Sequence, residues 1–204
     1  HSWSQSLYKN PPYETLRDFT PLGLAIESPR AIIIPKDLPV NTLPEFIAYL
    51  KANQDKVQFA SAGAGSASHV SCILLNAMLG LNVTHVPYRG LGPAMQDLIA
   101  GRVQYICDSV STSKPQIDGG HVKGIATTGL KRSPQLPDVP TFAELGFKNV
   151  EAAALVGMVV PAATPPDVIG TLNKQVVASI KDPAINKKLV DFGVEPVGNS
   201  PAQF

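Results

Sequence analysis

The sequence has few of the features that mark nucleic-acid-binding, membrane-spanning or metal-binding proteins. Its 204 residues carry a net charge of only +1, with no basic run and 6% aromatic residues, so nothing predicts a nucleic-acid partner. The longest apolar stretch, Ala152 to Ala163, is too short for a membrane span and contains Gly157 and Pro161, so we expect no direct membrane insertion. The histidines are dispersed and no cysteine pair has zinc spacing, so we expect neither a metal nor a cofactor. The hydrophobic content of 44% is typical of a soluble globular protein.

The chain contains only two cysteines, Cys72 and Cys107, which define no disulfide framework. Cys72 falls on the apolar face of a predicted helix, and Cys107 falls at the end of a predicted strand. We expect two free, buried thiols. The alternative is a disulfide, which requires close Cα atoms and an oxidising compartment.

Strands and helices are predicted to alternate along most of the chain. The apolar, β-branched run 31–34 predicts a strand that is buried on both faces. Thr42, Pro44 and Glu45 predict a capped helix start. The remaining predicted elements are strands at 57–60, 83–86, 103–107, 124–127 and 156–160, and helices at 66–79, 93–100, 115–117 and 141–145 and from 165 and 182 onward. This is a doubly wound α/β pattern, in which ligands bind at the carboxyl ends of the strands.

A loop of glycine and serine, residues 61–68, joins the predicted strand 57–60 to the helix 66–79. The first N–H groups of a helix have no intrahelical partner, and the macrodipole makes this end partly positive. Because glycines let a backbone approach a ligand closely, the loop predicts an anion site. A plain connection capped by Ser66 is the alternative. Ser68 stands where a dinucleotide fingerprint needs its third glycine, and no P-loop lysine is present, so nucleotide binding is disfavoured.

Ser66, His69 and Asp108 invite comparison with a catalytic triad, which makes a hydrolase one alternative function. Ser66 and His69 lie three residues apart on one predicted helical turn, and the chain has no G-x-S-x-G nucleophile elbow. We therefore expect no enzyme activity and no catalytic residues.

Four motifs occur in the order found in a known family. They are Leu7-Tyr8…Pro12-Tyr13…Asp18-Phe19-Thr20-Pro21, then Gly63-Ala64-Gly65-Ser66…His69, then Val86-Pro87-Tyr88-Arg89-Gly90, then Leu136-Pro137-Asp138-Val139-Pro140-Thr141-Phe142. Together they resemble the Bug-type substrate-binding receptors of tripartite tricarboxylate transporters, over essentially the whole chain.

The resemblance implies an extracytoplasmic, periplasmic solute-binding receptor, whose secretion signal has been removed. Its fold would be the two-lobed, type II-like periplasmic-binding-protein fold, each lobe a mostly parallel sheet flanked by helices. One lobe would comprise residues 1–29 and 152–204, and the other residues 30–151, with a hinged cleft between them. The implied receptor is a monomer that captures a small carboxylic acid and hands it to membrane subunits of the transporter. The alternative is a cytoplasmic ligand-sensing domain with the same cleft.

The expected ligand-binding residues belong to two turns and one strand end: Ser61, Ala62, Gly63, Gly65, Ser66, His69, Tyr88, Asp108 and Ser109. His69 either donates to the ligand or steadies the loop. Arg89 either pairs with a second carboxylate or is solvated. Asp108 would act through water or a ligand ammonium, because it would repel a carboxylate; an Asx turn through Ser109 to Ser111 is the alternative. Ser2 and Trp3 would border the cleft from the other lobe.

The sequence also departs from this family. Members usually have a strand and a proline- and glycine-rich loop before the position of His1, and a helix after that of Phe204. We therefore expect a processed or truncated chain, whose end-built lobe leaves strand edges and apolar faces exposed. At 154–157 the aromatic that is frequent near the cleft is missing. The residues do not distinguish among dicarboxylates, tricarboxylates, aromatic acids and acidic amino acids.

Overall fold

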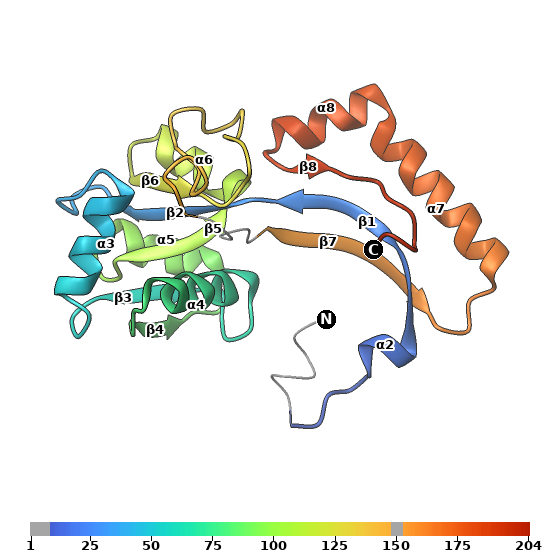
Figure 1. The fold of residues 1–204 in the computed structure, drawn as a ribbon, viewed down its shortest axis with the longest axis horizontal. Helices are drawn as coiled ribbons and strands as arrows, with labels where there is room; N and C mark the ends of the chain where they lie inside the picture. Colours follow the sequence, from blue (N-terminus) through green and yellow to red (C-terminus); the bar gives the residue numbers. More distant parts are fainter. Residues whose placement is uncertain (1–8, 148–152) are drawn as a thin grey trace. The chain divides into compact units, whose positions relative to one another are not determined.

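The chain divides into two compact units. The computed structural model describes residues 9–147 and 153–204 (Figure 1). His1–Ser28 and Ala154–Phe204 form one unit, here the terminal unit, and Pro29–Ala153 form the other, here the central unit. Ser2, Trp3 and the Leu7-Tyr8 motif lie outside the described residues. Within the described ranges, no helix has the length and apolar character needed to cross a membrane.

The central unit is built on a five-stranded mixed sheet with the order β4-β3-β5-β2-β6. The strands are β2 (Arg30–Pro35), β3 (Gln58–Ser61), β4 (Thr84–Pro87), β5 (Tyr105–Ser109) and β6 (Val122–Thr127). β3 runs parallel to both β4 and β5, whereas β2 runs antiparallel to both β5 and β6. The expected parallel arrangement therefore holds for three neighbouring strands and is wrong for β2.

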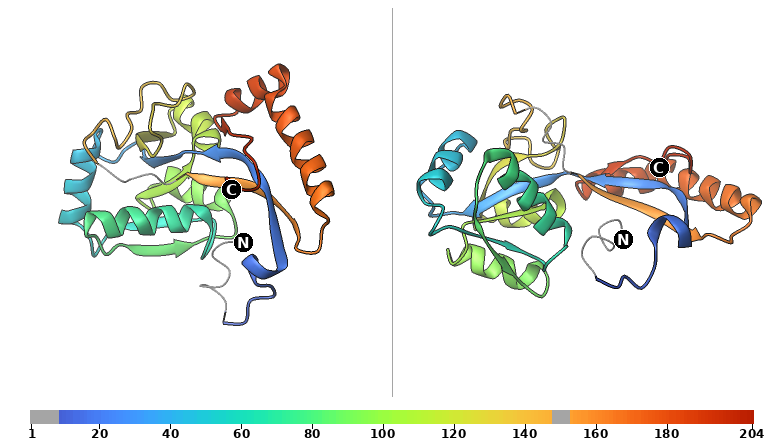
Figure 2. Two further views of the ribbon diagram at one scale, coloured as in Figure 1. Left: turned by 45° about the vertical axis from the view of Figure 1, so that its right-hand side comes forward. Right: turned by 60° about the horizontal axis from the view of Figure 1, so that its bottom comes forward.

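Helices cover both faces of this sheet (Figure 2). On one face, α3 (Leu43–Ala52) and α4 (Ala67–Leu79) bury side chains against Ile32 and Ile34 of β2. On the other, α5 (Leu91–Ile99) and α6 (Val110–Asp118) bury side chains against Ala31 and Ile33. Every residue of β2 is buried, which confirms the prediction of a strand covered on both faces.

Local signals in the sequence fix some helix ends and mislead at others. The Thr42–Glu45 capping box at the start of α3 is confirmed. The predicted helix 115–117 is in fact the last part of α6, which already begins at Val110 and contains Pro115 in its interior. The predicted helix 141–145 is wrong. Its backbone pairs with the end of β6 instead, because Thr127 donates to Pro140 and accepts from the N–H of Phe142.

The terminal unit has a three-stranded sheet with the order β7-β1-β8. β1 (Phe19–Ser28) pairs antiparallel with β7 (Ala154–Pro161) and with β8 (Glu195–Pro196), so the expected mostly parallel sheet is wrong here. The short helix α2 (Thr15–Asp18) precedes β1, and α7 (Pro166–Lys181) and α8 (Pro183–Asp191) lie between β7 and β8 in the chain. Apolar side chains of this unit that are more than two-fifths exposed include Leu155, Val156, Met158, Val159, Ile185 and Phe192.

A disulfide joins Cys72 of α4 to Cys107 of β5 in the central unit. Both residues are fully buried, and their Cα atoms are 5.5 Å apart. The expectation of two free thiols is wrong because α4 packs directly on β5, which brings the two cysteines within bonding range. This pairing depends on tertiary contact between residues 35 positions apart.

Candidate functional site

The loop between β3 and α4 is held by hydrogen bonds among its own residues. The N–H of Ala62 donates to Ser68 Oγ (3.0 Å), and that of Gly63 donates to Ser61 Oγ (3.1 Å). The N–H of Gly65 donates to His69 Nδ1 at 3.2 Å. These three N–H groups are therefore engaged in shaping the loop rather than free to bind a ligand.

Three other N–H groups of this loop and helix start have no acceptor among the described residues. They belong to Ala64, Ala67 and Ser68. Ser66 is the N-cap of α4, and its hydroxyl accepts from the N–H of His69 at 3.3 Å. Because Ala67 and Ser68 are the first two residues of a 13-residue helix, their N–H groups lie at its positive end. This arrangement can accept an anion.

The loop requires glycine at two positions. Gly63 has φ 123° and Gly65 has φ 76°, values that other residues rarely adopt. A Cβ on Gly63 would also lie 3.2 Å from the carbonyl oxygen of Tyr88. The two glycines thus shape the loop that presents the free N–H groups.

Two histidines and a phenylalanine stack beside the loop. The rings of His69 and His85 have centroids 4.1 Å apart, and Phe59 stacks on His85 at 4.8 Å. His85 Nε2 is 2.7 Å from Ser61 Oγ. Burial, followed by the nearby charge of His69, lowers the pKa of His85. The sequence analysis did not identify His85 as a candidate site residue. Its place beside Phe59 follows from the parallel pairing of β4 with β3, the strand that leads into the loop.

The His69 ring steadies the loop in this structure, because its Nδ1 accepts a hydrogen bond from the N–H of Gly65. The sequence left open whether His69 does this or donates to the ligand.

The turn after β4 is tied to the loop after β3. The N–H of Tyr88 donates to Ser61 O (3.1 Å), and that of Gly90 donates to Ala62 O (3.3 Å). The Tyr88 hydroxyl donates to Asp97 Oδ2 at 2.6 Å. Burial and the bond to Asp97 raise the pKa of Tyr88 to about 12. Tyr88 therefore braces the turn, and the neighbouring Arg89 is exposed.

Asp108 and Ser109 lie at the end of β5, the strand next to β3, and share no hydrogen bond with this cluster. Asp108 is fully buried; its Oδ1 accepts from the N–H of Ser109 at 2.7 Å, and its Oδ2 has no hydrogen-bond partner among the described residues. Burial is the main cause that raises the pKa of Asp108. The Ser109 hydroxyl is within hydrogen-bond distance of Ser111 and Thr112. The carboxylate thus engages the adjacent residue rather than forming the Asx turn through Ser111.

The sequence-predicted residues therefore fall into two groups. The structure brings seven of them together at the two turns: Ser61, Ala62, Gly63, Gly65, Ser66, His69 and Tyr88. Asp108 and Ser109 lie on the neighbouring strand β5 and are not hydrogen-bonded to them. The side chains of Ser66, His69 and Asp108 share no hydrogen bond with one another, as a triad would require. Over residues 9–147 and 153–204, no three His, Cys, Asp or Glu side chains are placed to hold a metal ion.

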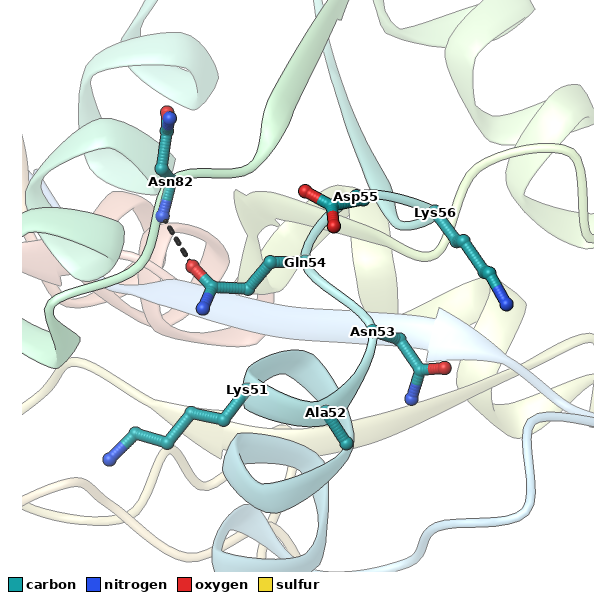
Figure 3. A pocket seen from close by; sticks show the side chains of 7 residues that line it. All are labelled: Lys51, Ala52, Asn53, Gln54, Asp55, Lys56 and Asn82. Carbon is teal, nitrogen blue, oxygen red and sulfur yellow. Dashed lines mark hydrogen bonds between the residues drawn. The ribbon is translucent and has the colours of Figure 1, made fainter.

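A polar pocket of about 270 Å³ lies between α3 and β3 (Figure 3). Its lining includes Lys51, Gln54, Lys56 and Asn82, and the Gln54 side chain accepts from the N–H of Asn82 at 2.9 Å. Because these residues precede β3 and β4, the pocket lies at the amino ends of the strands. It is therefore separate from the two turns at their carboxyl ends.

Comparisons with known proteins agree with this arrangement. The family described as "Tripartite tricarboxylate transporter family receptor" matches residues 3–204. The UPF0065 protein in the tcbD-tcbE intergenic region of Pseudomonas sp. (strain P51) is 36% identical over 195 residues, covering 95% of this chain and 58% of its own. This chain thus spans about three-fifths of the length of that curated relative.

Two solved structures share the fold along almost the whole chain. The periplasmic binding protein BugD is 40% identical, with a TM-score of 0.85, and the match covers 98% of this chain and 67% of BugD. Rpa4515 of R. palustris, solved with adipate, is 33% identical, with a TM-score of 0.87, over 96% of this chain and 66% of its own. These neighbours confirm the two-lobed, periplasmic-binding-protein-like α/β fold. The chain belongs to the tripartite tricarboxylate transporter receptor family, a family of substrate-binding receptors that includes the Bug proteins.

Proposed function

We propose that this chain is the ligand-binding part of a periplasmic receptor that captures a small carboxylic acid for a tripartite tricarboxylate transporter. One observation carries the proposal: the N–H groups of Ala64, Ala67 and Ser68 have no acceptor among the described residues, whereas those of Ala62, Gly63, Gly65 and Ser66 are hydrogen-bonded within the loop. A carboxylate supplies the oxygens that these donors lack. The adipate in the solved Rpa4515 structure is a ligand of this chemical class.

The energetics are sufficient for a useful affinity. A hydrogen bond to a charged group contributes about 1.5–3 kcal/mol, so three of them reach the range of a micromolar dissociation constant, about 8 kcal/mol. The loop is already ordered by its own bonds, so binding need not order it. Closure of two lobes around the ligand, which the family resemblance implies, is part of the same proposal.

The disulfide supports a periplasmic location. Disulfides persist in oxidising compartments such as the bacterial periplasm and are rare in the cytosol. The pair Cys72–Cys107 is fully buried in the core of the central unit, on the strand and helix beside the proposed site. This observation favours the receptor over the cytoplasmic sensor.

A proline at residue 67 tests the site without changing a side chain that could bind ligand. Ala67 is the first helical residue, where proline is well tolerated because its missing N–H has no helical partner. Ser66 has φ −66° and ψ 159°, which is the conformation that a following proline favours. Ala67→Pro should therefore keep the melting temperature and weaken carboxylate binding about tenfold. Ala67→Gly, which retains the N–H, is the matched control.

The measurement is calorimetric titration, after a thermal-shift screen against dicarboxylates, tricarboxylates, aromatic acids and acidic amino acids. A ligand at 100 times its dissociation constant should stabilise the fold by about 2.7 kcal/mol. Equal affinity of Ala67→Pro and Ala67→Gly would show that the site lies elsewhere. Failure of the unmodified protein to bind any carboxylate would contradict the proposed function.

A further inference from the structure

Arg30, the first residue of β2, is a buried cation without an ion-pair partner among the described residues. The whole residue is only 7% exposed, and its side-chain Nε is fully buried and has no hydrogen-bond partner among the described residues. Its guanidinium forms neither an ion pair nor a hydrogen bond with the described residues. Burial lowers the pKa of Arg30, and the charge of Asp108 opposes this from a distance. Buried arginines are normally paired, so the missing partner needs an explanation.

The sheet register places Arg30 on the same face as α4. Ile32 lies opposite Cys107, and Arg30 lies opposite Ser109, two residues further toward the carboxyl end of β5. Side chains two residues apart on a strand share a face, and the Cys107 side chain is bonded to α4 through Cys72. The Arg30 side chain therefore leaves the sheet on the face that α4 covers.

Arg30 is also at the same edge of the sheet as the proposed carboxylate site. β5 lies between β2 and β3, and α4 starts just beyond the carboxyl end of β3. Two strand spacings of about 4.8 Å separate β2 from β3 by roughly 10 Å, and the long Arg30 side chain spans part of this gap. The guanidinium and the free N–H groups at the start of α4 are thus two positive sites along one edge.

The backbone of Arg30 is fixed, which leaves its side chain as the group that can respond to a ligand. Its N–H donates to Thr128 Oγ1 (2.9 Å), and its carbonyl accepts from the N–H of Thr128 (2.8 Å). Two other buried polar atoms, Asp108 Oδ2 and Thr127 Oγ1, have no hydrogen-bond partner among the described residues, but they belong to the residues opposite Ala31 and so leave the sheet on the other face.

We propose that Arg30 binds a second carboxylate of the ligand, whose first carboxylate lies at the start of α4, and that the substrate is therefore a dicarboxylic acid. This inference rests on the proposed function. A guanidinium presents a planar fork of donors that matches a carboxylate, and such paired bonds are among the strongest in proteins. A bound dicarboxylate supplies the direct ion pair that no described residue forms with Arg30.

The test compares each dicarboxylate with the monocarboxylate of the same chain length. Succinate is paired with butanoate and adipate with hexanoate, and each is titrated calorimetrically into the unmodified protein and into Arg30→Met. The variant should bind the best dicarboxylate about 10- to 100-fold more weakly, with no change for its monocarboxylate partner. Arg30→Lys, which keeps the charge and loses the fork, should fall between the two.

Lys56→Met is the matched control, because it removes one positive charge at the opposite edge of the sheet, in the pocket of Figure 3. It should leave all affinities unchanged. Melting temperatures report the fold: replacing an unpaired buried cation with methionine should leave stability unchanged or raise it. A large loss of stability in Arg30→Met, with an unchanged ratio of dicarboxylate to monocarboxylate affinity, would assign Arg30 a structural role and overturn the inference.

The remaining outcomes separate the inference from the proposed function. Equal binding of dicarboxylates and monocarboxylates by the unmodified protein, or binding of aromatic acids only, overturns the role of Arg30 and leaves a carboxylate receptor. Binding of no carboxylate at all removes the proposed function, and the inference with it.

Discussion

His69 Nδ1 accepts a hydrogen bond from the N–H of Gly65, 3.2 Å away, and so ties the first turn of α4 to the loop before it. The ring of His85 lies against that of His69, with centroids 4.1 Å apart, and His85 Nε2 is within hydrogen-bond distance of Ser61 Oγ. The loop of the proposed carboxylate site is therefore in contact with His85, whose pKa is lowered mainly by burial.

We predict that the contribution of His85 to stability falls as the pH drops below about 6.5. The folded-state pKa of His85 is lowered, so at pH values between that pKa and the unfolded value of 6.5 the unfolded chain binds more protons. Stability therefore rises with pH through this window and is fully present above 6.5. Urea unfolding from pH 5 to pH 8 measures it.

His85→Gln is the informative variant, because glutamine keeps a partner for the Ser61 hydroxyl and does not titrate. The difference in unfolding free energy between the two proteins should change with pH only below about 6.5. Asp108, whose raised pKa acts with the opposite sign, is present in both proteins and cancels in this difference. A difference that is constant from pH 5 to pH 8 would contradict the lowered pKa of His85.

The features that the sequence predicted correctly are local. The cap at Thr42, the strand 31–34 and the glycine loop that leads into α4 each depend on residues within one turn or one strand. At these positions the capping signal, the β-branched run and the glycine conformations favour the structure that forms. Of the seven predicted residues that lie together at the two turns, five belong to this loop and strand end, and the other two to the helix start and the next turn; their role in binding stays a prediction.

What the sequence did not predict depends on distant contacts. β1 contains Pro21 and Gly23, which interrupt a strand pattern, and its pairing with β7 has register shifts between Pro21 and Gly23 and between Leu24 and Ile26. A Cβ on Gly23 would lie 2.8 Å from the carbonyl oxygen of Asn199, a contact made only in the folded chain. The disulfide likewise depends on the packing of α4 on β5. The positions of His85 beside Phe59 and of Arg30 beside Ser109 depend on which strands pair.

The substitution Gly63→Ala should both destabilise the protein and weaken carboxylate binding. The φ of 123° and the approach to Tyr88 O at 3.2 Å both oppose a Cβ, and strain of this kind costs about 1–3 kcal/mol. Gly80→Ala, at the C-cap of α4, is the control: φ is 65°, and a Cβ there meets nothing within 4 Å. It should cost about 1 kcal/mol, without an effect on carboxylate affinity. Equal effects of the two substitutions on affinity would contradict the role of Gly63.

Reduction of the Cys72–Cys107 disulfide should lower the unfolding free energy by about 4 kcal/mol, the loop-entropy value for a separation of 35 residues. Because both cysteines are fully buried, reduction should be slow until the protein opens. Thermal unfolding with and without dithiothreitol measures the change. The double variant Cys72→Ala, Cys107→Ala should have about the same stability as the reduced protein, and dithiothreitol should not change it. Insensitivity of the unmodified protein would instead indicate free thiols.

Asp108→Asn should stabilise the protein at neutral pH. Burial is the first cause that raises the folded-state pKa of Asp108, and the charge of Arg30 is the last, so the ionised carboxylate is unfavourable in the fold. Asparagine keeps an oxygen for the N–H of Ser109 and carries no charge.

The pH dependence of this gain has a definite sign. For an acid whose folded pKa is raised, the native state binds more protons between the unfolded value of 3.8 and the folded value, so stability rises as the pH falls through that window. The advantage of Asp108→Asn should therefore be largest at neutral pH and should shrink on acidification, as measured by urea unfolding of both proteins between pH 4 and pH 7. A loss of stability in the variant at pH 7 would contradict the prediction, because it would mean that the interactions with Thr112, Ser109 and Arg30 outweigh the cost of burying the charge.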